Sequence, residues 1–97
     1  MQHNYFVYIL TNLSKTVLYT GVTNDIDRRL FEHKNSINKN AFTSKYKCYY
    51  LLYCKRFQFI DDAIDFEKRI KGWSRKKKED LINERNPNWN FLNKETT

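Results

Sequence analysis

The stretch VLYTGVTNDIDRRLFEHK, residues 17–34, decides how the chain folds. Its first residues are β-branched or aromatic and are typical of a buried strand. Thr23, Asn24 and Asp25 then offer N-cap side chains, and the charged sequence that follows predicts a helix. Gly21 falls where the strand gives way to the helix, and there it permits a backbone conformation that other residues resist or the close approach of a ligand. The stretch therefore predicts a strand that turns directly into a helix.

Similar patterns on either side of this stretch predict two more strands. Aromatic and β-branched runs occur at residues 5–11 and 46–56. Residues 12–15, with the sequence NLSK, predict the turn of a hairpin that joins the first strand to the second. Residues 35–45 are polar, so we expect a surface loop there.

Two helices are expected toward the end of the chain. One begins near Ile60 and ends near Gly72, and the other is capped by Ser74 and stopped by Pro87. The order β-β-α-β-α-α predicts an α/β (α+β) fold, in which the third strand joins the hairpin in a small mixed sheet covered by helices. The length of 97 residues suits one domain, residues 1–97, with a catalytic core at about 4–83 and a C-terminal extension at 84–97.

Basic side chains clearly outnumber acidic ones. The chain has 18 Lys and Arg against 11 Asp and Glu, a formal charge of +7. Such an excess favours polyanionic partners through electrostatic attraction and counterion release. It also keeps a small protein in solution, so charge alone leaves nucleic-acid binding as one of two explanations.

The two cysteines, Cys48 and Cys54, both fall in the strand expected at residues 46–56. An extended chain would hold them about 20 Å apart, beyond the reach of a disulfide, so we expect free, buried thiols. The sequence has no signal peptide, no apolar run long enough to cross a bilayer and no cysteine spacing typical of a metal site. We therefore expect a cytoplasmic protein with no membrane contact.

Two polar residues fall on the apolar stripe of the first helix. Each residue advances a helix by about 100°, so Arg29 and His33 share the face marked by Ile26 and Leu30. Asp27, Arg28 and Glu32 are expected to point elsewhere. Arg29 could simply extend along the helix edge, and His33 could be a core residue with one hydrogen bond. Two such residues one turn apart, just after a glycine, favour a functional site.

The second helix carries one inward acidic residue. Glu67 projects near the middle of an apolar face that includes Ile64 and Ile70. Burying a carboxylate against an apolar surface costs about several kcal/mol of free energy unless the carboxylate is paired, hydrogen-bonded or bound to a cation. A structural pair with an arginine such as Arg29 would give the same pattern, and the sequence does not separate the two.

The hairpin adds two phenols to this set. If residues 12–15 form its loop, Tyr8 and Tyr19 lie directly opposite one another, although aromatic cross-strand pairs are usually packing. The sequence has no Ser-His-Asp order, no glycine-rich phosphate loop and no Cys/His metal cluster. One acid, one cation and phenols or an imidazole suit attack of water on a phosphodiester, with Glu67 holding a divalent metal and Arg29 stabilising charge on the phosphate.

These residues resemble the GIY-YIG endonuclease superfamily, in particular its small stand-alone members. The tripeptides VYI at residues 7–9 and YTG at 19–21 stand where that family has its two motifs. The segment TNDIDRRLFEH and the glutamate of AIDFEKRIKGWSRKKKEDLI are similar in type and order. The resemblance covers nearly the whole chain.

The resemblance implies a three-stranded antiparallel sheet flanked by helices and DNA cleavage dependent on Mg²⁺ or Mn²⁺. It assigns the motif tyrosines to Tyr8 and Tyr19, the motif glycine to Gly21 and the family arginine to Arg29. It makes His33 an additional proton-transfer residue and Glu67 the metal ligand. The first motif lacks its glycine, Thr20 replaces an isoleucine, and Val22 stands where repair-type relatives often carry lysine.

A basic segment, KRIKGWSRKKK, follows Glu67 and surrounds Trp73, which we expect to pack inward. Its side chains are candidates for phosphate contacts that position DNA without reading its sequence. Together with Gly21, the DNA-binding candidates are Lys68, Lys71, Arg75, Lys76 and Lys77.

The sequence thus predicts a metal-dependent DNA endonuclease, with a possible place in repair or recombination. Since no recognition domain is expected, structured, branched or damaged DNA is a better candidate substrate than a fixed sequence. The alternative is a nucleic-acid-binding module that keeps the fold without catalysis. A protein-contact scaffold is a third interpretation, supported only by the aromatic run YKCYYLLY.

Overall fold

Three antiparallel strands form the centre of the protein, here described from a computed structural model that covers residues 4–35 and 41–93. The strands are β1 (Tyr5–Thr11), β2 (Leu18–Thr23) and β3 (Tyr50–Phe57), in the spatial order β2-β1-β3. Strand β1 is therefore central, which explains why both of its faces are apolar. The sheet is antiparallel throughout, as the family resemblance implies, and not mixed.

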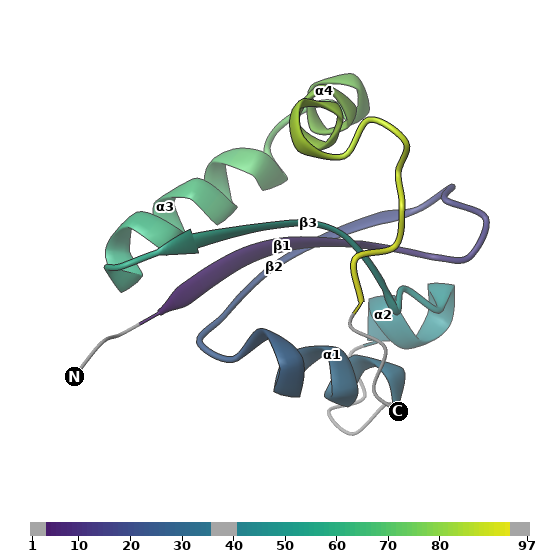
Figure 1. Cartoon of the computed structure of the whole chain (residues 1–97), viewed down its shortest axis with the longest axis horizontal. Helices are drawn as coiled ribbons and strands as arrows, with labels where there is room; N and C mark the ends of the chain where they lie inside the picture. Colours follow the sequence, from purple (N-terminus) through teal and green to yellow (C-terminus); the bar gives the residue numbers. More distant parts are fainter. Residues whose placement is uncertain (1–3, 36–40, 94–97) are drawn as a thin grey trace.

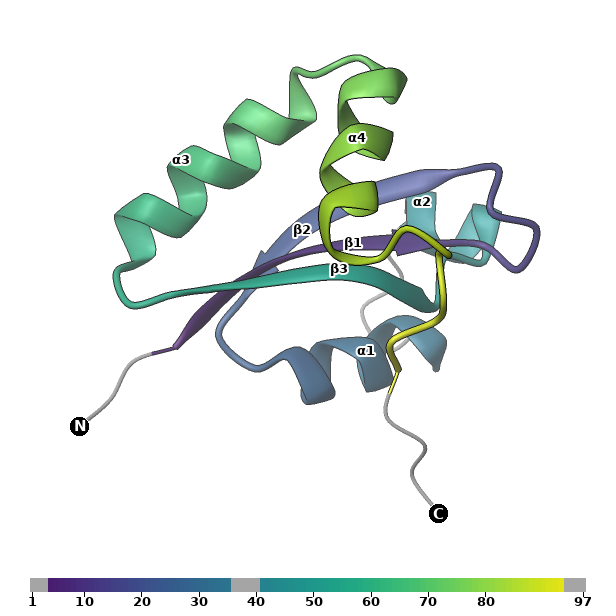
Figure 2. The same cartoon turned by 45° about the horizontal axis from the view of Figure 1, so that its top comes forward.

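Helices cover both faces of the sheet (Figures 1 and 2). One face carries α1 (Ile26–Lys34) and the short α2 (Ala41–Tyr46), and the other carries α3 (Ile60–Lys71) and α4 (Arg75–Arg85). The expected order β-β-α-β-α-α is confirmed for the larger elements, with α2 added between α1 and β3.

Each face of the sheet has its own apolar cluster. Val7 and Ile9 of β1 point toward α3 and α4, where they join Ala63, Ile70 and Ile82. Trp73 packs at the edge of that cluster, as expected.

The alternate residues of β1 point the other way. Tyr8 and Leu10 face α1 and pack with Ile26 and Leu30. The period of two along β1 thus delivers Tyr8 to the face that carries α1.

The hairpin loop is longer than predicted, because the side chain of Asn12 organises it. Its Oδ1 accepts hydrogen bonds from the backbone N–H groups of Thr16 (2.9 Å) and Val17 (3.1 Å), which removes both from the strand ladder. The loop therefore spans six residues, and β2 begins at Leu18. This corrects the pairing: Tyr8 lies opposite Gly21, and Tyr19 lies opposite Leu10.

Two other expectations along the chain are wrong in part. The loop predicted at 35–45 contains α2, and its residues 36–40 lie outside the described part of the chain. The third strand begins at Tyr50 and not at residue 46, because Tyr46 ends α2. A six-residue helix is weak by itself, so α2 depends on tertiary contacts that a local pattern does not reveal.

The helix boundaries agree closely with the sequence. Asp25 caps α1 by accepting from the backbone N–H of Arg28, and Ser74 caps α4 by accepting from that of Lys77. Helix α4 ends two residues before Pro87. Cys48 and Cys54 are free, as predicted, although Cys48 precedes β3 and only Cys48 is fully buried.

Candidate active site

The candidate site is built around Tyr8, whose ring lies across Gly21 on the neighbouring strand. A Cβ atom placed on Gly21 would lie 2.5 Å from Cζ of Tyr8. Neither glycine of the chain has a positive φ, and Gly21 sits inside β2, not at its end. The close approach that the glycine permits is therefore that of the Tyr8 phenol, and no special backbone conformation is involved.

Two side chains from α1 meet the Tyr8 hydroxyl. The Nε–H of Arg29 donates to Oη at 3.3 Å, and Nε2 of His33 lies 3.0 Å from the same atom. Tyr8 is 1% exposed and His33 is 4% exposed, whereas the Arg29 side chain keeps 25% of its surface. The helical stripe argument is thus confirmed, since Arg29 and His33 both turn inward.

One arrangement of protons satisfies every hydrogen bond in this cluster. Oη of Tyr8 accepts from Arg29 and donates its own proton to Nε2 of His33. In that tautomer Nδ1 of His33 donates to Oγ1 of Thr43, 3.2 Å away. Thr43 is buried on α2 and was missed from sequence because its segment was expected to be a loop.

Burial keeps both Tyr8 and His33 neutral near pH 7. Desolvation raises the pKa of Tyr8 to about 12, and the hydrogen bond and charge of Arg29 offset this only in part. Desolvation, helped by the charge of Arg29, lowers the pKa of His33 to about 4. A neutral imidazole is therefore in place to receive the phenol proton.

Tyr19 lies beside this cluster. Its ring meets the His33 ring edge-on, with 5.7 Å between centroids, and lies at the same separation from Phe42 of α2. It shares a face of the sheet with Tyr8 because the corrected register differs from the expected one by two residues, an even number.

Glu67 lies on α3, which covers the other face of the sheet (Figure 1). Its side chain is 14% exposed, and its carboxylate lies 3.5 Å from Nζ of Lys71. Burial is the main cause of the raised pKa of Tyr8, and the charge of Glu67 adds to it, which places the carboxylate within electrostatic reach of the phenol.

The sequence left open an ion pair between Glu67 and Arg29, but in the structure Arg29 pairs with a different acid. Arg29 pairs with Glu32 at 3.3 Å, so the expectation that Glu32 points elsewhere is wrong. The two side chains can pair because Glu32 lies one turn along from Arg29 on α1, and the Glu32 side chain is 21% exposed. The ion pair of Glu67 is with Lys71 instead.

A single carboxylate, that of Glu67, is the candidate ligand for a cation, and it suits a hard cation that keeps most of its own water. Within residues 4–35 and 41–93, no group of three His, Cys, Asp or Glu side chains is arranged to hold a metal. Mg²⁺ commonly binds through one or two carboxylates together with water and substrate phosphates. A lone, largely buried carboxylate such as Glu67 fits that mode of binding and does not fit a closed protein cage.

The predicted DNA-binding side chains differ in their exposure and in their contacts with other residues. Lys68 is exposed, Lys76 pairs with Asp80 at 3.4 Å, and Lys77 lies 5.0 Å over the ring of Trp73. Arg75 donates to the carbonyls of Thr16 (2.6 Å) and Lys15 (3.2 Å). Its guanidinium thus holds the hairpin loop, a structural contact that the sequence did not suggest.

A three-stranded antiparallel sheet in the order β2-β1-β3, with helices on both faces, is a nuclease-like fold. The chain belongs to the GIY-YIG catalytic domain family, which matches residues 4–80.

Relatives of similar size support this assignment. A UPF0213 protein of Bacillus pumilus is 36% identical over 83 residues, covering 86% of this chain and 83% of the relative. One from Natronomonas pharaonis is 34% identical over 82 residues, covering 84% and 94%. The solution NMR structure of the UPF0213 protein BH0048 from Bacillus halodurans is 30% identical, with a TM-score of 0.56 and 89% of each chain covered.

In the described ranges, none of the helices α1 to α4 is both long and apolar enough to cross a membrane.

Proposed function

We propose that this protein is a divalent-metal-dependent endonuclease that hydrolyses DNA phosphodiester bonds, in repair or recombination. The observation that carries the proposal is the Tyr8 hydroxyl held between Nε of Arg29 and Nε2 of His33. A buried phenol aligned on a neutral imidazole is arranged for proton transfer and is more than core packing requires. Tyr19 and Gly21 complete this side of the site.

In the proposed mechanism Tyr8 takes the proton of the attacking water as its own proton passes to Nε2 of His33. With a pKa raised to about 12, Tyr8 stays protonated at neutral pH, and with a pKa lowered to about 4, His33 is a weak base. The imidazole therefore accepts the proton only as negative charge develops on the attacked phosphate. The geometry favours Tyr8 over Tyr19 as the base, because Tyr8 is the phenol bonded to His33. Arg29, whose side chain is partly exposed, stabilises the charge that grows on the phosphate.

Glu67 is the proposed ligand of Mg²⁺ or Mn²⁺. When bound, such an ion supplies a positive charge that polarises the phosphate oxygens. Glu67 contributes the carboxylate that binds the ion. The Lys71 side chain, which pairs with this carboxylate in the structure, would then contact DNA instead. With 14% of its side chain exposed, Glu67 is more shielded from bulk water than the acid of an ordinary surface ion pair, and this supports the proposed role.

The proposed DNA surface includes exposed lysines of α3 and α4, which would follow the phosphate backbone without reading bases. Those candidates remain Lys68, Lys71, Lys76 and Lys77, together with Arg75. We propose structured, branched or damaged DNA as substrate, one domain over residues 1–97 with its core at about 4–83, and a cytoplasmic location. The free thiols of Cys48 and Cys54 support the last point.

A plasmid-nicking assay tests the proposal. Supercoiled and branched DNA would be incubated with wild type, Glu67→Gln and Tyr8→Phe, each with Mn²⁺ or with a chelator. We expect metal-dependent nicking by wild type and a loss of at least about 100-fold in both variants, the size typical of acid–base and metal contributions. Asp65→Asn, an exposed acid on the same helix, is the matched control and should nick normally.

The alternative function makes a different prediction in the same assay. A binding module without catalysis would bind DNA but leave plasmid intact under every metal condition. If Glu67→Gln nicked like wild type, the metal-site assignment would be lost even if cleavage were real.

A further inference from the structure

Helix α2 presents two aromatic rings to solvent beside the candidate site. Phe42 and Tyr46 are one turn apart, 41% and 40% exposed, with 4.8 Å between their ring centroids. Phe42 also packs 5.7 Å from Tyr19. Tyr19, Phe42 and Tyr46, called here the aromatic strip, therefore form a continuous row of rings from the site to the surface.

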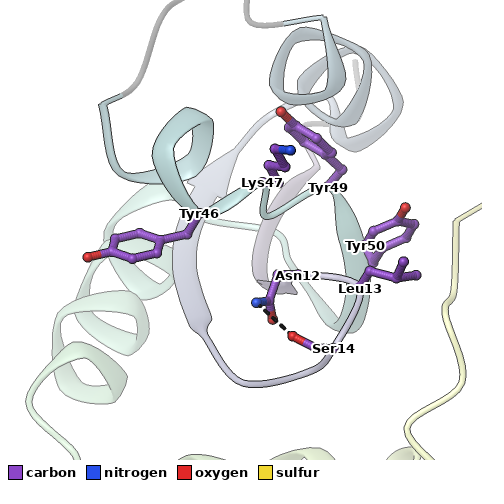
Figure 3. A pocket seen from close by; sticks show the side chains of 7 residues that line it. All are labelled: Asn12, Leu13, Ser14, Tyr46, Lys47, Tyr49 and Tyr50. Atoms are coloured by element: carbon purple, nitrogen blue, oxygen red, sulfur yellow. Dashed lines mark hydrogen bonds between the residues drawn. The ribbon is translucent and has the colours of Figure 1, made fainter.

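The strip ends at a hollow of about 380 Å³ between the hairpin loop and the start of β3 (Figure 3). Tyr46 lies on one side of it and Leu13 and Tyr50 lie on the other, with Lys47 and Tyr49 between them. The volume is within the range of sites for small organic groups. The hollow thus extends the row of rings by a place for one more flat group.

Positive charge accompanies the rings along this surface. Nζ of Lys45 lies 5.3 Å over the ring of Tyr46, and Lys47 lines the hollow. None of the residues that line the hollow is acidic. The sequence FTSKYKCYY, residues 42–50, therefore places four rings and two cations close together, a combination that suits a ligand with flat faces and a regular negative charge.

We propose that the aromatic strip and the hollow bind unpaired nucleotides of a DNA strand next to the phosphodiester that is cut. Only an unpaired base can offer its face to these rings, because a duplex hides base faces in its own stack. Lys45 and Lys47 contact the phosphates of the same strand. The inference rests on the proposed function and narrows its substrate to DNA with a single-stranded segment beside the cleavage point.

A binding experiment without metal tests this inference separately from cleavage. Fluorescence anisotropy in chelator would compare a labelled oligothymidylate with a blunt duplex of two complementary strands for wild type, Phe42→Ala and Tyr46→Ala. We expect each variant to bind the single strand about fivefold to 100-fold more weakly, the range for losing one stacked base, with little change for the duplex. Phe42→Trp should restore binding.

Phe59→Ala is the matched control, since it removes a ring that is 61% exposed at the start of α3, away from α2. It should leave both affinities unchanged. Thermal melting would verify that each variant is folded, and Phe42→Leu replaces Phe42→Ala if the latter is not.

Three results would overturn the inference. The first is that wild type does not bind the single strand. The second is that the variants bind the single strand as tightly as wild type does. The third is that the variants lose affinity for single strand and duplex equally. Binding of an apolar peptide at the strip with no effect of Phe42→Ala on DNA would assign the surface to a protein partner instead. This experiment measures binding and not cleavage, so the two proposals can fail independently. Nicking that depends on Glu67 would support the nuclease even if the strip does not bind single strands. Binding of single strands at the strip would stand even if no nicking were found.

Discussion

The ring of Tyr8 covers Gly21 on the adjacent strand, so that a side chain at position 21 would occupy the space of the phenol. The two residues are direct cross-strand partners. The glycine therefore fixes where the Tyr8 hydroxyl lies, and through it the contacts with Arg29 and His33.

Gly21→Ala should displace the Tyr8 ring and break its hydrogen bonds with α1. We expect nicking to fall by about 100-fold and the free energy of unfolding to fall by about 1–3 kcal/mol, as for other overpacked cores. Gly72→Ala is the control, because its Cβ would meet only ordinary contacts, the nearest at 3.6 Å. That variant should be slightly more stable than wild type by urea unfolding.

The lowered pKa of His33 makes stability depend on pH. The folded protein holds the imidazole neutral down to about pH 4, whereas the unfolded chain protonates it near 6.5. Between these values the unfolded state binds more protons than the folded state. The contribution of His33 to the free energy of unfolding is therefore fully present above pH 6.5, and it falls by about 3 kcal/mol as the pH drops toward 4. Urea unfolding at a series of pH values should show this slope in wild type and a flatter one in His33→Gln.

Thr43 should act as a positioning residue for His33. Thr43→Val keeps the shape but removes the acceptor of Nδ1–H, so we expect a loss of about 1–3 kcal/mol in stability and nicking slower by roughly tenfold. Nitrogen NMR shifts of His33 would report a mixed tautomer in this variant. Thr43→Ser, which restores the hydroxyl, should recover both properties, and a Thr43→Val variant with an unchanged tautomer would contradict the role.

Thr20 and Thr11 offer a matched pair on neighbouring strands. Within the described residues, Oγ1 of Thr20 is buried without a hydrogen-bond partner, whereas Oγ1 of Thr11 donates to the carbonyl of Val17 at 2.7 Å. Thr20→Val should raise the free energy of unfolding by about 1 kcal/mol, and Thr11→Val should lower it by about as much. Equal effects of the two substitutions in denaturant melts would contradict this account.

If Glu67 binds a cation as proposed, Lys71 is a competitor for its carboxylate, because Nζ of Lys71 lies 3.5 Å from that carboxylate. Lys71→Met should therefore bind Mn²⁺ more tightly in the absence of DNA, by up to about fivefold, since partly exposed ion pairs contribute about 1 kcal/mol or less. Isothermal titration would measure the affinity. Lys68→Met makes the same charge change on the exposed part of α3 and should have a smaller effect, whereas Glu67→Gln should abolish the binding.

Local sequence was enough to predict the strands, the larger helices and their order. A period of two in β1 and side-chain caps such as Asp25 and Ser74 act over a few residues, so their consequences can be read along the chain. Helical geometry likewise sufficed to choose Arg29 and His33 as the inward residues, because the angle between successive side chains does not depend on the rest of the protein.

Tertiary contacts decided what the local patterns left open. The side chain of Asn12 lengthened the hairpin loop and placed Tyr8 over Gly21, and packing around Thr43 made a helix where a loop was expected.

The electrostatic effect of Glu67 on Tyr8, across the sheet, also required the fold. By itself the sequence determined that Arg29, His33 and Glu67 turn inward, since that follows from the geometry of each helix, although it misplaced Glu32. Only the tertiary structure decided which of them meet, because those distances depend on loop length and packing between elements far apart in the chain.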